Sequence, residues 1–288
     1  MADDVWTVGR LLTWTTDWLA TKGSESPRLE AEVLLAHVRG CQRILLYTAF
    51  DTPVADAERA RFRALVKRRG EGEPVAYLVG SREFFSLPFA VSPAVLVPRP
   101  ETEGLVVRVI DLCQGLDAPR IVDVGTGSGA IAVTAAKRLP RARVVATDIS
   151  AAALAVAGDN ARRHGVAERV EIVECDLLDD PRAAGPWDVV VSNPPYVRDD
   201  EFDSLPRDVR LHEPKGALVA GPTGVEVIAR LAHQAAERLA AGGWLIVEMG
   251  PSVAAAAEAA VAAVEGLRLE PTLKDLAGLA RILQARKA

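Results

Sequence analysis

The sequence predicts an α/β protein in which a small helical domain precedes a parallel β-sheet. Apolar residues recur at helical spacing over residues 1–73, and from residue 99 onward strand-like runs alternate with Ala-rich helical stretches. Such alternation is typical of a parallel sheet covered by helices. Between these regions, residues 74–98 carry Pro and Gly among short aromatic runs, which indicates a β-hairpin linker.

The first region, residues 1–73, predicts a bundle of four or five short helices. Ser24–Pro27 and Asp51–Pro53 interrupt the helical pattern with polar residues and Pro, which are typical of helix starts and breaks. Apolar residues fall three and four positions apart, as one buried helix face requires. Examples are Leu11, Trp14, Trp18, Ala31, Leu34, Leu35 and Val38.

Composition is that of an ordinary globular chain of 288 residues, with 49% hydrophobic and 25% charged residues. The formal net charge of −5 argues against general affinity for nucleic acid. Three distant cysteines, Cys41, Cys113 and Cys175, indicate core thiols in a reducing compartment. The acidic start of the chain lacks the features of a signal peptide, no apolar run is long enough for a membrane span, and no metal-ligand spacing is present. We therefore expect a cytoplasmic protein without a metal.

The second region predicts a succession of short buried strands. Each strand run is rich in β-branched residues and precedes a helical stretch. The predicted strands are Arg120–Val124, Arg143–Thr147, Val170–Glu174, Trp187–Ser192, Trp244–Glu248 and Ala280–Ala285.

A glycine-rich loop follows the first of these strands and contains Gly125, Thr126, Gly127, Ser128 and Gly129. Glycines at such a strand-to-helix turn let the backbone turn tightly and let a ligand approach closely. The loop alone is compatible with a packing turn or with a dinucleotide-binding loop.

Carboxylates at the ends of the next two strands help to identify the ligand of this loop. Asp148 lies about twenty residues after the loop, where it can accept hydrogen bonds from both hydroxyls of a ribose. Asp176 ends the following strand and is expected near an adenine amino group, with Leu177 covering the ring. Asp123, just before the loop, suits a cationic ligand better than a pyrophosphate. This combination favours S-adenosylmethionine over NAD.

The fourth strand ends in Asn193, Pro194, Pro195 and Tyr196, the most specific string in the chain. Two prolines fix the backbone at the ligand-binding edge of the sheet. The side-chain carbonyl of Asn193 and the backbone carbonyl of Pro194 can together accept both hydrogens of a planar NH2 group, while Tyr196 offers a flat face for stacking. Holding both N–H groups orients a poorly nucleophilic amide nitrogen for methyl transfer without a strong general base.

With these motifs, the chain resembles the HemK/PrmC family, which methylates the glutamine of the Gly-Gly-Gln motif in peptide chain release factors. The resemblance extends over nearly the whole length. It includes further runs at Pro74–Gly80, Glu83–Phe85, Val97–Glu103, Glu213–Leu218 and Asp275–Arg281.

The resemblance implies a class I S-adenosylmethionine-dependent methyltransferase: a Rossmann-like, seven-stranded, mostly parallel sheet at 99–288, behind a helical substrate-recognition domain and the hairpin. Gly125 to Gly129, Asp148 and Leu177 would line the cofactor. Residues Asn193 to Tyr196 would hold the substrate glutamine, with Asn193 also beside the cofactor. The stretch from Arg99 to Thr102 would lie beside the methionine end of the cofactor, unless Arg99 and Glu101 form a structural ion pair instead.

Two positions depart from the family pattern. Glu248-Met249-Gly250 continues without the Gln that often follows three residues after the Gly, and Ser86 replaces a common Gly. Neither position belongs to the predicted reaction centre.

Three other functions are compatible with parts of this pattern. A glutamine methyltransferase acting on a ribosomal protein would share Asn193–Tyr196, and an adenine N6 methyltransferase would bind the same two N–H groups. A non-catalytic binding module would be expected to lose Asn193 or the glycine loop, and both are present. We expect a monomer whose partners are class 1 release factors and not membranes or nucleic acid.

A cluster of basic residues lies in the predicted helical domain. It is either a solvated helix face or a surface that meets acidic residues of the release factor. Its members are Arg59, Arg61, Arg63, Lys67, Arg68 and Arg69.

Overall fold

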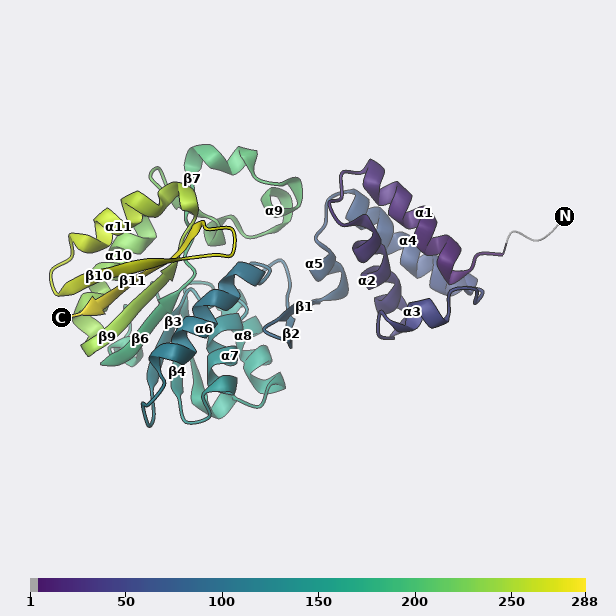
Figure 1. The fold of residues 1–288 in the computed structure, drawn as a ribbon. Helices are drawn as coiled ribbons and strands as arrows, with labels where there is room; N and C mark the ends of the chain where they lie inside the picture. Colours follow the sequence, from purple (N-terminus) through teal and green to yellow (C-terminus); the bar gives the residue numbers. More distant parts are fainter. Residues whose placement is uncertain (1–4) are drawn as a thin grey trace. The chain divides into compact units, whose positions relative to one another are not determined.

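The computed structural model describes residues 5–288, which divide into two compact units. The first unit runs as far as Gly80 and includes the later segment Pro206–His212, whereas the second contains Ser81–Leu205 and Glu213–Ala288 (Figure 1). The acidic start at residues 1–4 lies outside the described residues. Across the described part, every helix is too short or too polar to cross a membrane.

The first unit is a helical bundle. Thr7 caps its first helix by accepting a hydrogen bond from the Arg10 backbone N–H at 3.3 Å, and Gly40 ends the second helix in a left-handed conformation. Buried side chains such as Leu12, Leu34 and Phe62 form its core. The helices are α1 (Val8–Thr21), α2 (Pro27–Arg39), α3 (Leu45–Thr48), α4 (Asp56–Gly70) and α5 (Val75–Val79).

Two segments of this unit lie outside the expected first domain, residues 1–73. The segment Val75–Val79 is a helix that buries Tyr77 and Leu78, so the hairpin begins only at Ser81. Short helix α9 (Arg207–His212), far along the sequence, also belongs to this unit, where Asp208 lies 3.7 Å from the Arg69 guanidinium. Only three-dimensional packing could reveal this membership.

In the second unit, seven strands of the described chain form one sheet in the order β10-β11-β9-β6-β3-β4-β5. The five strands from β9 to β5 are parallel to one another, while β11 is antiparallel to both β9 and the edge strand β10. The sheet is therefore mostly parallel, as expected. Its strands are β3 (Arg120–Val124), β4 (Arg143–Asp148), β5 (Val170–Glu174), β6 (Trp187–Ser192), β9 (Leu239–Glu248), β10 (Leu267–Lys274) and β11 (Ala280–Lys287).

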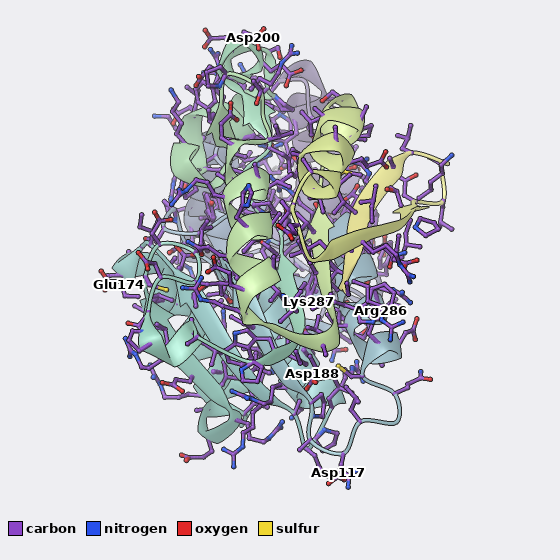
Figure 2. The ribbon with its side chains drawn as sticks, turned by 90° about the vertical axis from the view of Figure 1, so that its left-hand side faces the viewer. Asp117, Glu174, Asp188, Asp200, Arg286 and Lys287 are labelled. Atoms are coloured by element: carbon purple, nitrogen blue, oxygen red, sulfur yellow. The ribbon has the colours of Figure 1, made fainter. Side chains whose placement is uncertain are left out.

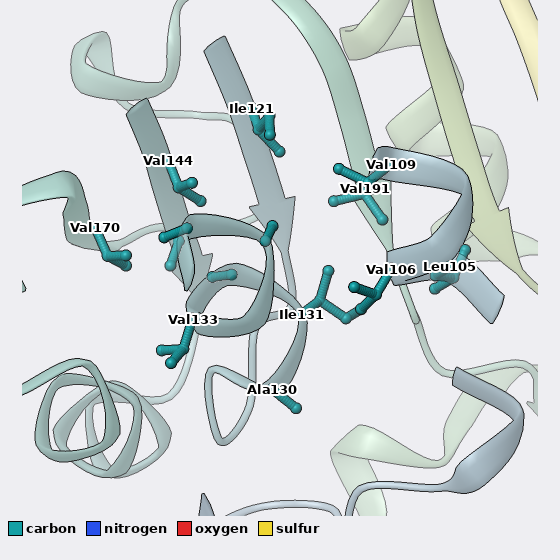
Figure 3. Close-up of a cluster of buried hydrophobic side chains, with 14 of the residues drawn as sticks. Leu105, Val106, Val109, Ile121, Ala130, Ile131, Val133, Val144, Val170 and Val191 are labelled. Atoms are coloured by element: carbon teal, nitrogen blue, oxygen red, sulfur yellow. The ribbon is translucent and has the colours of Figure 1, made fainter. Parts of the chain in front are cut away.

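Helices cover both faces of the sheet. Alternate strand residues enter opposite cores, so that Ile121 packs beneath α6 and α7 while Val122 packs beneath α10 and α11. Figure 3 shows the first core, in which the side chains of Ile131 and Val106 point toward each other. The helices are α6 (Glu103–Leu112), α7 (Ala130–Arg138), α8 (Ala151–Arg163), α10 (Glu226–Arg238) and α11 (Ala254–Ala262).

Figure 2 looks onto the face covered by α10 and α11, where the Lys287 ammonium donates to the Ala236 carbonyl. In that view Asp117 and Asp188 lie at one end of the sheet and Asp200 lies at the other. Register places Val124 opposite both Thr147 and Ser192, so the carboxyl ends of β3, β4 and β6 are level. The loops that follow these strands consequently meet at one edge.

Short elements complete the second unit. A hairpin packs Phe84 and Phe89 into the core beneath α6 and α7, and a small parallel pair follows Tyr196. The short strands are β1 (Ser81–Phe84), β2 (Leu87–Ala90), β7 (Val197–Arg198) and β8 (Val219–Gly221). The 3-10 turns are η1 (Pro100–Thr102), η2 (Ala167–Arg169), η3 (Pro181–Ala183), η4 (Asp199–Ser204), η5 (Lys215–Ala217) and η6 (Pro251–Val253).

Candidate active site

The three glycines of the loop after β3 have two different roles. Gly125 and Gly127 have φ angles of 69° and 55°, and a Cβ at either position would enter open space. By contrast, a Cβ on Gly129 would lie 3.2 Å from Ala157 of α8. The first two glycines therefore leave room above the loop for a ligand, and the third permits close packing of the helix that follows.

Asp123 holds this loop from below. Its Oδ2 accepts hydrogen bonds from the Thr126 hydroxyl at 2.7 Å and from the Ala132 backbone N–H at 3.0 Å. The side chain is fully buried, and burial raises the pKa of Asp123 to about 7. Asp123 does not line the cavity described below, so its direct contribution is to the shape of the loop.

Asp148 ends β4 and faces the same loop. Its two carboxylate oxygens accept backbone N–H groups from Gly127 and Ser150, both at 2.9 Å. A carboxylate has lone pairs left after two such bonds, so Asp148 can still accept hydroxyl groups of a ligand. Gly127 is in this way tied to the carboxylate predicted to hold the ribose.

Asp176 and Leu177 follow β5. Asp176 Oδ2 pairs with the Arg230 guanidinium at 2.6 Å, and both residues line the cavity. Leu177 takes a left-handed φ of 55° and also lines it. Cys175, expected to be a core thiol, instead lies half-buried at the cavity wall.

These loops enclose a cavity of about 400 Å³. Its size lies within the range of small-molecule sites. Among the predicted cofactor residues, Gly129 alone is absent from the lining of this cavity in the described structure. The predicted residues that line it are Gly125, Thr126, Gly127, Ser128, Asp148, Asp176, Leu177, Asn193, Pro194 and Pro195.

Asn193 lies at the end of β6, beside the loop of β3. The preceding Ser192 fixes the strand end by donating its hydroxyl to the Val124 carbonyl at 2.7 Å. Asn193 Nδ2 donates to the Thr102 hydroxyl oxygen at 3.1 Å. This bond uses the donor end of the amide and leaves its carbonyl oxygen for a ligand.

Tyr196 lies on the far side of the two prolines. It does not line the 400 Å³ cavity but a neighbouring one of about 280 Å³, together with Arg281 and Gly250. A Cβ on Gly250 would approach the Tyr196 ring to 3.1 Å. Burial raises the pKa of Tyr196 to about 12, so the ring remains a neutral phenol.

Comparison with known proteins identifies the family. Residues 10–80 match the PrmC N-terminal domain, and residues 105–208 match the methyltransferase small domain. A release factor glutamine methyltransferase of Rhodopirellula baltica is 50% identical, covering 99% of this chain and 98% of the relative. The chain belongs to the release factor glutamine methyltransferase family. A family member from Bordetella pertussis is 45% identical over 94% of this chain and 98% of its own.

Solved structures of other methyltransferases have the same fold as this chain. The hMettl16 catalytic domain in complex with a MAT2A 3'UTR hairpin aligns with a TM-score of 0.55 at 18% identity, covering 81% of each chain. A 16S rRNA N2 G1207 methyltransferase from T. thermophilus, in complex with AdoMet and guanosine, aligns with a TM-score of 0.52 at 17% identity. It covers 72% of this chain and 50% of the other. The Rossmann-like methyltransferase fold expected from the sequence is confirmed, and the chain is a methyltransferase.

Arg99, expected beside the cofactor or paired with Glu101, has a different ionic partner. Its guanidinium lies 2.6 Å from the buried carboxylate of Glu213, which also accepts the Val97 backbone N–H at 3.2 Å. Arg99 and Thr102 both line the cavity. Sequence reasoning missed the Arg99–Glu213 pair because 114 residues separate the two side chains.

The basic cluster of α4 is largely neutralised by its surroundings. Arg68 binds Glu73 at 2.7 Å, and Arg69 binds Glu30 at 2.8 Å. Weaker pairs join Arg59 to Asp56 and Lys67 to Glu71. Arg61 and Arg63 are exposed and form no ion pair with a described residue.

Proposed function

We propose that this chain transfers a methyl group from S-adenosylmethionine to the side-chain amide nitrogen of the glutamine in the Gly-Gly-Gln motif of release factors. The observation that carries the proposal is the amide of Asn193, held at the wall of a ligand-sized cavity with its carbonyl available. The names of its relatives support the same substrate.

The residues of the larger cavity fit S-adenosylmethionine. Gly125 and Gly127 leave space where any side chain would intrude, Asp148 offers free acceptor lone pairs, and Leu177 presents an apolar surface. When bound, this cofactor supplies an electrophilic methyl group. We assign Asp148 to its ribose, Leu177 to its adenine, and Asp176 to the adenine amino group after rearrangement of the Arg230 pair.

At the substrate side, the protein needs to hold an amide rather than to deprotonate it beforehand, because the nitrogen can release one of its two protons to solvent after it has gained the methyl group. The Asn193 side-chain carbonyl and the Pro194 backbone carbonyl accept the two N–H bonds of the glutamine amide, while Pro195 and Tyr196 confine its stem. Two acceptors on one nitrogen favour positive charge developing there, so the transition state is stabilised more than the ground state. The partly buried, neutral Tyr196 ring contributes shape rather than charge.

We assign substrate recognition to the N-terminal unit, with class 1 release factors as partners in the cytoplasm. Arg61 and Arg63 are the basic side chains of α4 that remain available to meet an acidic partner surface. A charge-reversed Arg61→Glu/Arg63→Glu protein that binds a release factor with unchanged affinity would remove this contact.

A methyl-transfer assay read by mass spectrometry tests the function. The purified protein is incubated with S-adenosylmethionine and a release factor, beside the same release factor with its Gly-Gly-Gln glutamine changed to Ala. A ribosomal protein and DNA serve as parallel substrates. We expect one added methyl group on the intact motif alone, whereas methylation of the ribosomal protein or of adenine would overturn the substrate assignment.

A further inference from the structure

Glu248 is a buried carboxyl group that the proposed function leaves unused. It ends β9 with 3% of its surface exposed and lines neither cavity. Its Oε2 has no hydrogen-bond partner among residues 5–288. Since burying an unpaired carboxyl oxygen costs stability, its position calls for an explanation.

Thr102 links this carboxyl group to the reaction centre. Its hydroxyl is the hydrogen-bond donor that lowers the pKa of the Glu248 carboxyl, and its oxygen accepts the Asn193 Nδ2–H at 3.1 Å. These three side chains form a series that runs from Glu248 of β9 through Thr102 of η1 to Asn193, the residue after β6. Thr102 and Asn193 line the larger cavity, whereas Glu248 does not.

We propose that Glu248 and Thr102 are positioning residues that determine which end of the Asn193 amide faces the substrate nitrogen. The proposal rests on the proposed function, because it concerns the acceptor that holds the glutamine amide. It assigns Glu248 and Thr102 no contact with the transferred methyl group.

The number of available protons determines which group donates and which accepts in the hydrogen bonds that join Glu248, Thr102 and Asn193. An ionised carboxylate can only accept, so the single proton of the Thr102 hydroxyl points to Glu248 and its lone pairs face Asn193. Asn193 must then present Nδ2 to Thr102 and Oδ1 to the substrate. If Glu248 gains a proton, its O–H can donate to Thr102, and the Thr102 proton is free to turn toward Asn193. That arrangement favours the flipped amide, whose NH2 opposes the NH2 of the glutamine.

The surroundings of Glu248 shift its pKa so that it gains its proton within a pH range in which the enzyme can be assayed. The pKa of Glu248 is raised to about 7: burial, the largest cause, and the charge of Glu101 raise it, while the Thr102 hydrogen bond and the charges of Arg281 and Arg99 lower it. Tyr196, which also faces this group, remains a phenol throughout the range. The acceptor arrangement is therefore expected above about pH 7 and the flipped one below it.

Steady-state kinetics between about pH 6 and about pH 8.5 test the proposal. For the wild type we expect kcat to fall on the acid side with a midpoint near pH 7. Glu248→Gln cannot ionise, so its kcat should lose this acid limb. Thr102→Val should lower kcat about 10- to 100-fold, as expected for a residue that orients a reacting group, with a much smaller change in cofactor affinity. Thr102→Ser should restore most of the rate.

A matched control separates this effect from loss of a buried hydroxyl. Thr134 of α7 is fully buried and its hydroxyl has no partner among the described residues, so Thr134→Val should leave kcat unchanged. An acid limb that persists in Glu248→Gln would assign it to another group, such as Asp123, and would overturn the proposal. A Thr102→Val protein with the wild-type kcat would do the same.

A measurement without substrate distinguishes failure of this proposal from failure of the proposed function. The side-chain amide NMR signals of Asn193, assigned by their loss in Asn193→Ala, should shift with pH around a midpoint near 7. They should not shift in Glu248→Gln. If the wild type fails to methylate a release factor but these signals titrate as described, the proposed function fails and the Asn193 orientation remains. Signals that do not titrate in the wild type contradict the orientation itself.

Discussion

Asn193 is the side chain on which methyl transfer depends most directly. Asn193→Ala removes an acceptor that the transition state needs, so we expect kcat to fall about 10²- to 10³-fold, as when one transition-state hydrogen-bond partner is lost. Cofactor affinity should change far less, because the loop of β3 and Asp148 remain. Stopped-time methylation assays together with calorimetric titration of the cofactor check both parts. A mutant that keeps near-wild-type kcat would show that the acceptor role is wrong.

Gly127 allows a second prediction at the scale of one residue. Gly127→Ala adds a side chain in left-handed backbone and into the open space above the loop, so we expect weaker cofactor binding besides a strain of about 1–2 kcal/mol. Gly115 provides the control, since its φ of 88° and open surroundings are similar but it lies outside the cavity. Gly115→Ala should lose similar stability in urea denaturation and retain normal cofactor affinity. Equal affinities for both variants would contradict the assignment.

The sequence was sufficient to identify the site residues whose positions depend on the strand that they follow. Gly125 and Gly127 of the β3 loop, Asp148 and Asn193 lie at or just after the ends of strands at spacings that topology constrains, and the fold brings them to one cavity. Thr102 was expected beside the cofactor, but its contact with Asn193 was not identified, nor were Glu213 and Glu248 as supports of this site. They act through side chains 91 or more residues away, and only the packed sheet brings such partners into contact.

At the scale of elements, one edge strand was predicted and the other was not. The central strands β3 and β6 have the predicted bounds, because continuous β-branched runs are typical of central parallel strands, and the edge strand β5 has them as well. Strand β10 was missed. It lies at the sheet edge with mostly half-buried residues and contains Pro271, which a central strand would exclude.

The hairpin depends on one side chain of α8. Asn160 is fully buried, accepts the Ala90 backbone N–H at 2.8 Å, and donates to the carbonyls of Ala90 at 3.0 Å and Ser128 at 2.8 Å. It thus joins strand β2 to the cofactor loop.

Asn160→Ala should lower the free energy of unfolding by about 1–3 kcal/mol, because it leaves buried backbone groups unpaired. Urea denaturation measures this loss, and cofactor affinity should weaken as Ser128 loses its support. Asp159→Ala, at the neighbouring exposed position, serves as the control and should stay within about 0.5 kcal/mol of the wild type. An Asn160→Ala protein as stable as this control would show that the hairpin is held by its apolar contacts alone.

The whole molecule should become less stable as the pH rises from about 5 to about 7.5. Burial raises the pKa of both Asp123 and Glu248 to about 7. Between the ordinary pKa of about 4 and this raised value, the folded state binds more protons than the unfolded state, so stability falls with rising pH. Above both pKa values, these two groups no longer make the stability depend on pH.

Denaturation midpoints across this pH range measure the effect. Glu248→Gln should show a shallower decline than the wild type, because one of the two groups no longer titrates. A wild-type stability that rises through the same interval would contradict the assignment of protonated, buried carboxyl groups in the folded state.

Helix α9 has a consequence for dissecting this enzyme. Its residues are encoded between η4 and Glu213 but pack with the N-terminal helices, where Asp208 lies near Arg69. No single cut along the polypeptide separates the two units. A fragment beginning at Ser81 would carry α9 without the bundle it packs into, and a fragment ending at Gly80 would lack it. The two fragments are therefore expected to fold and stay in solution only when they are produced together, as complementing halves of one protein.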